Sequence, residues 1–83
     1  MKELFEAIKE ADPVEVDTAW AVLKYKNIGI LRKLKSLCLI FDLDEEGILD
    51  EAPKDESGRI LDHETRHAIH DELILVSQNK THE

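Results

Sequence analysis

The chain has little of what covalently cross-links a small protein. It holds one cysteine, Cys38, among 83 residues, so an intramolecular disulfide is excluded. A single cysteine inside an apolar run, here 37–41, is typical of a thiol that packs as a small hydrophobe in a reducing compartment. Because a domain of this length has a marginal core, good packing, a metal ion or a partner chain must stabilise it.

Long hydrophobic runs are also absent. No apolar run approaches the roughly 18 residues of a membrane span, and the segment 1–6 carries acids where a secretory signal peptide needs an apolar core. We therefore expect a cytoplasmic protein without a membrane partner. Leu, Ile, Val and Phe supply 25 of the 83 residues, too many for a disordered chain of this charge, and the length fits a single domain over 1–83.

Positive charge is scarce and unevenly placed. The formal net charge is −8, from 11 Lys and Arg against 19 Asp and Glu. The stretch 24–35 holds five bases and no acid, whereas the chain from Asp42 onward holds thirteen acids and four bases. A phosphate backbone would meet a mostly like-charged surface, so no direct nucleic-acid partner is expected. The basic stretch is interpreted as a solvated face that pairs with acidic segments of this chain or of a sister chain.

Helix signals are strongest near the N-terminus. Apolar residues at helical spacing predict a first helix over 2–11. Asp12 is a good N-cap, Pro13 suits the first helical position, and Glu15 stands at the third position of a capping box. These residues predict that a second helix begins at Pro13.

From Pro13 the apolar positions advance by four and three residues in turn, a period of about 3.5 that is typical of a helix packing along a seam. The seam crosses Gly29 without losing register, which favours one long or kinked helix over 13–42. In the alternative, the helix ends near Asn27 and Gly29 takes the left-handed conformation of a helix C-terminus. A short buried strand at 36–41 competes with the end of the long helix. The seam, the predicted interface, consists of Val16, Trp20, Leu23, Asn27, Ile30, Leu34, Leu37 and Phe41.

The length of this helix predicts self-association. A helix over 13–42 is about 45 Å long, whereas a compact monomer of this size is only about 30 Å across. The projecting end would be apolar, and soluble monomers avoid such exposed patches. We therefore expect a homodimer or a higher oligomer in which a sister chain covers the seam.

The C-terminal half predicts a loop and one more helix. Glycine and proline interrupt the acidic stretch 42–58, which indicates a loop. The similar pieces 48–50 and 60–62 could pair as a short β-hairpin before the last helix, which is expected over about 63–78 with Ile69, Leu73 and Val76 facing inward. The predicted fold class is thus mainly α: a small helical bundle around one long helix.

The segment from His63 to His67 reads HExxH. Over these five residues it resembles the zincin metallopeptidases, in which two histidines one turn apart bind zinc and the glutamate is the general base. The resemblance implies His63 and His67 as ligands and Glu64 as the base. Two departures argue against it: Arg66 places a cation inside the motif, and His70 stands where the metzincin continuation has glycine. We interpret the match as fortuitous and predict no cofactor.

Three histidines nevertheless share one helical face. His63, His67 and His70 fall within an arc of about 60°. Neighbouring pairs could chelate a metal ion, but all three cannot easily share one, because His63 and His70 lie ~10 Å apart along the helix axis. The alternatives are a pH-sensitive contact, since imidazoles titrate near neutrality, and an ordinary solvated or interfacial face.

The stretch 42–50 resembles the first nine positions of an EF-hand calcium loop. The resemblance implies carboxylate ligands along the stretch and a sharp turn at Gly47. Position twelve, however, is Pro53 instead of the bidentate glutamate. An acidic turn after a helix is the simpler interpretation.

The function predicted from these features is a non-enzymatic protein-interaction module. An apolar face larger than so short a chain can use alone, with acids around it, suits a small regulator or inhibitor that binds and blocks another protein, for example a nucleic-acid-binding protein or repressor. The alternative is a divalent-metal-binding protein or a zinc hydrolase that uses His63, Glu64 and His67.

Overall fold

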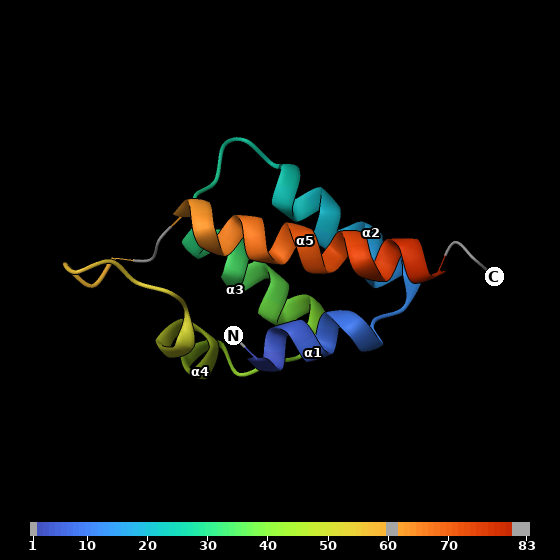
Figure 1. Ribbon diagram of the computed structural model, residues 1–83, viewed down its shortest axis with the longest axis horizontal. Coiled ribbons are helices and arrows are strands. Elements are labelled where there is room, and N and C mark those ends of the chain that lie inside the picture. The colour runs from blue at the N-terminus through green and yellow to red at the C-terminus, as the bar shows by residue number, and fades with distance from the viewer. Residues whose placement is uncertain (1, 60–61, 81–83) are drawn as a thin grey trace.

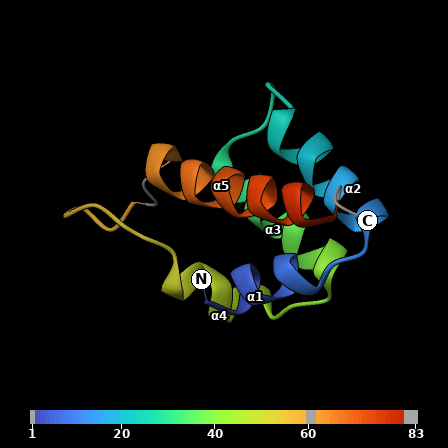
Figure 2. The ribbon, with the colours of Figure 1, turned by 45° about the vertical axis from the view of Figure 1, so that its right-hand side comes forward.

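Five α-helices and the connections between them form the described part of the chain. The computed structural model describes residues 2–59 and 62–80, and no β-strand occurs among them. The helices are α1 (Lys2–Glu10), α2 (Pro13–Lys24), α3 (Ile30–Phe41), α4 (Glu45–Glu51) and α5 (Asp62–Lys80). Helix α5 packs against α1, α2 and α3, with α2 on one of its sides and α1 and α4 on the other (Figures 1 and 2). The fold is therefore an all-α bundle, in agreement with the predicted class.

The beginning of α2 is held by the predicted cap. Asp12 is the N-cap, and its backbone N–H donates a hydrogen bond of 3.1 Å to Oε1 of Glu15. Pro13 occupies the first helical position. Proline has no backbone N–H, and at this position an N–H would have no acceptor within the helix. Helix α1 ends just before this cap and buries Leu4 and Ile8. The first predicted helix and the predicted start of the second are confirmed.

The long helix predicted over 13–42 is wrong. Helix α2 ends at Lys24, and the following Tyr25 is extended, with φ −68° and ψ 118°. Gly29 is extended too, with φ −77° and ψ 171°, so it is the N-cap of α3 and not a left-handed C-terminal residue. Its carbonyl accepts the first α3 hydrogen bond, 3.1 Å from the N–H of Lys33. The break is favoured because it lets α2 and α3 pack against each other, so that both halves of the seam are buried within one chain.

The seam thus contributes mainly to the core of the chain itself. Trp20 and Phe41 are partly buried at its margin, and Asn27 is exposed in the connection between α2 and α3. The radius of gyration, 12.4 Å, is close to the ~12 Å expected for a compact chain of this length. The projecting helix that motivated a sister chain does not exist, and self-association stays a prediction. The buried seam residues are Val16, Leu23, Ile30, Leu34 and Leu37.

The stretch after α3 forms a turn and a helix instead of a calcium loop. Asp42 adopts the left-handed conformation, with φ 55° and ψ 53°, and the N–H of Leu43 donates to the Cys38 carbonyl at 2.8 Å. This arrangement is a common way to end a helix. Gly47 lies inside α4, where it cannot make the sharp turn of an EF-hand loop. The strand proposed for 36–41 is likewise replaced by helix α3.

The predicted β-hairpin is not formed. Residues 48–50 belong to α4, because Ile48 is fully buried in the core when this stretch is helical. Residues 60–61 of the second predicted strand lie outside the described residues. The connection 52–59 extends away from the bundle (Figure 1). Its turn is closed by Asp55, and the hydrogen bonds from the Ser57 hydroxyl and then from the Arg59 N–H lower the pKa of that carboxyl.

The last helix faces the core as predicted. Ile69 and Leu73 are fully buried on α5, and Val76 is nearly so. The helix is longer than the predicted 63–78 by one residue at its start and two at its end. Over the described ranges, none of the helices combines the length and apolar character that crossing a membrane requires.

The conformation of Gly29 can be tested by two substitutions. At an N-cap, serine stabilises a helix more than alanine by about 1 kcal/mol, whereas inside a continuous helix alanine is the better residue by up to about 0.5 kcal/mol. No atom lies within 4 Å of a Cβ added at Gly29. We therefore expect Gly29→Ser to be more stable than Gly29→Ala in urea denaturation. The opposite order would support the continuous helix.

Two leucines of α3 provide a matched test of the core. Leu34 is 0% exposed and Leu39 is 80% exposed. We expect Leu34→Ala to lower the free energy of unfolding by about 2–5 kcal/mol, because it opens a cavity in the core, and Leu39→Ala to change it by about 0.5 kcal/mol or less. Chemical denaturation of both variants measures the difference. Equal losses would mean that α3 packs by another face.

Candidate functional site

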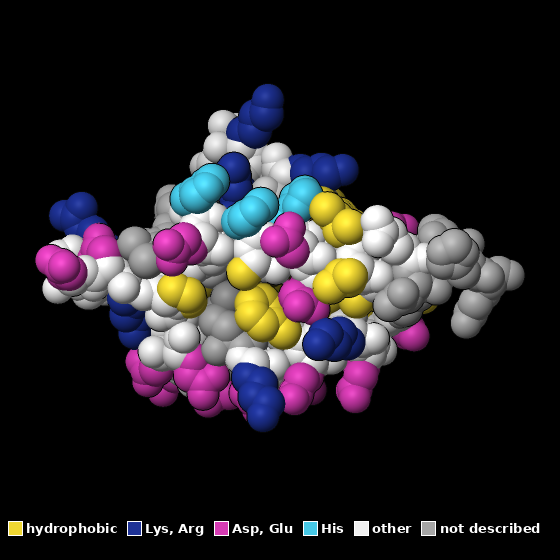
Figure 3. All heavy atoms as spheres, in the orientation of Figure 1, with side chains coloured by type: hydrophobic (Ala, Val, Ile, Leu, Met, Phe, Trp, Pro, Cys, Tyr) yellow, Lys and Arg dark blue, Asp and Glu magenta, His cyan; other side chains and the backbone are white. Residues whose placement is uncertain are grey.

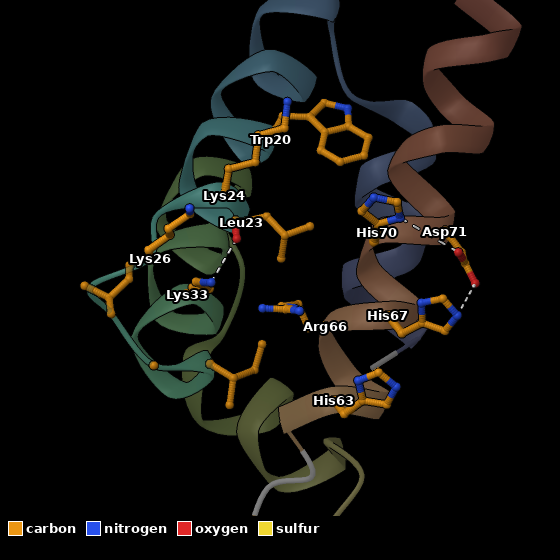
Figure 4. A pocket seen from close by; sticks show the side chains of 13 residues that line it. Trp20, Leu23, Lys24, Lys26, Lys33, His63, Arg66, His67, His70 and Asp71 are labelled. Carbon is orange, nitrogen blue, oxygen red and sulfur yellow. Dashed lines mark hydrogen bonds and ion pairs between the residues drawn. The ribbon is translucent and has the colours of Figure 1, made fainter.

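A cleft of about 920 Å³ lies between α5 and the end of α2 with the connection that follows it (Figure 4). Lys33, from α3, lies among the lining residues although its side chain is buried. The wall formed by α2 and the connection includes Trp20, Leu23, Lys24, Lys26 and Ile28. The wall formed by α5 includes His63, Arg66, His67, His70 and Asp71.

The residues from α5 share this wall because of their spacing. Positions three and four apart lie one above another on a helix, and all three predicted histidines line the cleft. Figure 3 shows them as a row along α5. Arg66, which departs from the zincin motif by its positive charge, lines the same cleft. Glu64 is exposed and does not line it.

The imidazoles are ordered by one another and by one carboxylate. The rings of His63 and His67 are stacked, with centroids 5.9 Å apart and an interplanar angle of 6°. The carboxylate of Asp71 lies 3.9 Å from Nε2 of His67 and 4.0 Å from Nδ1 of His70. Within the described ranges, no group of three or more His, Cys, Asp or Glu side chains is placed to hold a metal ion. His63 and His67 are thus a pair of potential ligands without a third.

Trp20 lies at one end of the cleft. Its ring meets His70 edge-on, with centroids 4.9 Å apart and an angle of 89°. The ammonium of Lys24 lies 5.2 Å from the centre of the Trp20 ring, within the range of a cation–π contact. The sequence indicated Trp20 only as a seam residue. The indole therefore joins the core to the cleft and supplies an aromatic surface beside the ammonium of Lys24 and the imidazole of His70.

The burial of Lys33 differs most from what the sequence predicts. It was interpreted as part of a solvated face, yet it is only 5% exposed. Its Nζ donates a hydrogen bond of 2.8 Å to the carbonyl of Leu23, which is one of the carbonyls that the end of α2 leaves without a helical partner. In the described part of the chain, no acidic side chain forms an ion pair with Lys33. A buried charge without a counter-ion is costly, and no local sequence signal marks it.

The charge of the cleft is opposite to that of the protein. Four Lys and Arg side chains line it, against the single acid Asp71, although the chain as a whole has 19 acids and 11 bases. Several acids gather along the edge of the molecule opposite the histidines (Figure 3). Walls of low dielectric concentrate such a potential inside a cleft. The arrangement is suited to attracting and holding an anion. The cations are Lys24, Lys26, Lys33 and Arg66.

Cys38, the one cysteine of the chain, does not line the cleft. Cys38 is buried in the core, and burial raises the pKa of its thiol, with smaller contributions from Glu45 and Asp44. A thiol of this kind is a poor nucleophile because the thiolate is disfavoured. Its packing agrees with its interpretation as a small hydrophobe.

Known proteins add no family to this description. No protein-family model, no curated protein and no solved structure matches the chain. The resemblance to zincins thus stays confined to the five residues that carry it. Function must be inferred from the chemistry of the cleft.

The metal-binding alternative has a direct test. We expect the protein, purified without chelator and without an affinity tag, to contain well below one zinc ion per chain, because two imidazoles supply only half of the four ligands of a structural zinc site. Elemental analysis measures the content. One zinc per chain that is lost in His67→Ala and retained in His70→Ala would contradict this expectation and favour the alternative.

Proposed function

We propose that this protein is a non-enzymatic binding module whose α2–α5 cleft holds an acidic segment of a partner protein. One observation carries the proposal: four Lys and Arg side chains and one acid line a cleft in a chain of net charge −8. The side chains gathered there attract and hold an anion, which is the reason for proposing binding instead of catalysis. A module that occupies such a segment would mask it from other partners, which is how a small regulator or inhibitor acts.

The side chains of the cleft suit carboxylates in different ways. The guanidinium of Arg66 is planar and presents parallel N–H groups that match both oxygens of a carboxylate. Lys24 and Lys26 are exposed and act as mobile point charges that need no fixed geometry. Trp20 and Ile28 add apolar surface to the lining, against which the aliphatic part of a bound segment can pack.

The acidic remainder of the surface supports specificity. An acidic partner is repelled by most of the molecule and attracted at the cleft, so the encounter is oriented before contact. A long polyanion such as a nucleic acid would extend over the repelling surface on both sides. A short acidic segment of a protein can enter the cleft alone, and we therefore propose a protein partner.

Charge reversals inside and outside the cleft test the proposal. Trp20 is the only tryptophan and lines the cleft, so its fluorescence reports occupancy by a hexaglutamate peptide. We expect Lys26→Glu and Arg66→Glu each to weaken peptide binding by about tenfold, or ~1.4 kcal/mol, and added salt to weaken it further. The matched control is Arg32→Glu, because Arg32 is exposed in the same basic stretch but does not line the cleft.

The control separates a local effect from a global one. All three variants change the net charge equally, and we expect Arg32→Glu to bind within about twofold of the parent, as separated exposed charges are largely screened at physiological salt. Equal losses in the three variants would show that overall charge, and not the cleft, governs binding. No binding of the peptide to the parent protein would overturn the proposal.

A further inference from the structure

We infer that the cleft contains a subsite for one phosphoryl group, held between the ammonium of Lys33 and the guanidinium of Arg66. The inference rests on the proposed function and deepens it: the acidic segment that the cleft takes would carry a phosphorylated side chain. Three observations support it, concerning the buried cation, the cation on the opposite wall and the single acid nearby.

The first observation is that Lys33 is a built-in cation with unused donors. Its side chain is 5% exposed, and its one hydrogen bond within the described residues goes to the Leu23 carbonyl at 2.8 Å. An ammonium has three N–H donors, and a neutral carbonyl leaves its charge without compensation. An anion that pairs with such a group offsets part of the cost of burying its charge. Because Lys33 lines the cleft, a bound anion can provide that charge.

The second observation is that a second cation lies on the opposite wall. Arg66 extends from the opposite wall toward the side of the cleft on which Lys33 lies, and the Lys33 ammonium is directed at the Leu23 carbonyl (Figure 4). Among the described residues no carboxylate forms an ion pair with Arg66. An anion bound between the two side chains would be attracted by both of them.

The third observation is that the one acid of the cleft is turned to other groups. Each oxygen of the Asp71 carboxylate lies against an imidazole, at 3.9 Å from His67 and 4.0 Å from His70. The Asp71 carboxylate is thus directed at the imidazoles, and among the described residues it forms no ion pair with Lys33 or Arg66. This arrangement favours the binding of an external anion by Lys33 and Arg66.

The charge of the pair selects a phosphoryl group over a carboxylate. A phosphoryl group carries about −1.5 to −2 charges near neutral pH and three acceptor oxygens, so each wall can bind its own oxygen. A carboxylate carries one charge and two oxygens, so its single negative charge can balance only one of the two cations. Lys24 and Lys26, near the exposed margin, remain available for carboxylates of the same segment.

Inorganic phosphate and three peptides test the subsite on the full chain. The peptides share one acidic sequence and carry phosphoserine, serine or glutamate at the central position, at constant ionic strength. Binding is followed by Trp20 fluorescence, and the position of the anion by amide shifts in two-dimensional NMR. We expect phosphate alone to shift the amides of Lys33 and Arg66, and the phosphoserine peptide to bind at least tenfold more tightly than the glutamate peptide.

Two variants and one control assign the preference to its residues. Arg66→Gln and Lys33→Met should each reduce the preference for phosphoserine over glutamate to below threefold, while the glutamate peptide still binds through Lys24 and Lys26. Arg32→Gln removes the same charge outside the cleft and should keep the preference. If Lys33→Met does not fold, as circular dichroism would show, Arg66→Gln decides alone, because Arg66 is exposed.

The outcomes separate this inference from the proposed function. Equal binding of the phosphoserine and glutamate peptides, with no shifts from phosphate, overturns the subsite and leaves the acidic-segment module intact. Shifts at Lys33 and Arg66 with phosphate, but no binding of any peptide, support the subsite for a free anion and overturn the peptide partner. Equal preference in the parent and in Arg66→Gln overturns the assignment to these two residues.

Discussion

The hydrogen bond from the buried ammonium of Lys33 to the carbonyl of Leu23, 2.8 Å long, joins the first turn of α3 to the end of α2. It satisfies a carbonyl that the end of a helix leaves free, and it lies where the chain turns back between the two helices. The cleft depends on this turn, because one of its walls is the end of α2 with the connection 25–29. The same bond brings a positive charge into the interior, where it has no acidic partner among the described residues.

The apolar seam is what makes the turn favourable. In a single long helix its two halves would need another chain to cover them. Folded back, they meet each other and α5, so that Leu23, Ile30 and Leu34 are buried without a partner. Each buried side chain of this kind contributes about 1.5–3 kcal/mol. The bundle thus buries within one chain the apolar seam whose exposure was the reason for expecting an oligomer.

The second constraint is the distribution of charge. A chain with a net charge of −8 repels anions over most of its surface, yet its cleft gathers four of its cations. In Figure 3 several acidic side chains lie along the edge of the molecule opposite the row of histidines. Local potential, and not net charge, decides what a cleft attracts. This is why an acidic protein can be proposed to bind an acidic ligand.

The sequence by itself determined the helical class, the start of α2 and the core face of α5, because these depend on near neighbours: Asp12 caps with Glu15, and the apolar spacing of α5 repeats with each turn. Only the tertiary structure decided the break at Gly29, since a seam in register is equally compatible with one helix or two. The candidate cleft required the same knowledge. The histidine face could be predicted from spacing, but the burial of Lys33 and its position opposite Arg66 depend on segments more than thirty residues apart, which no local pattern connects.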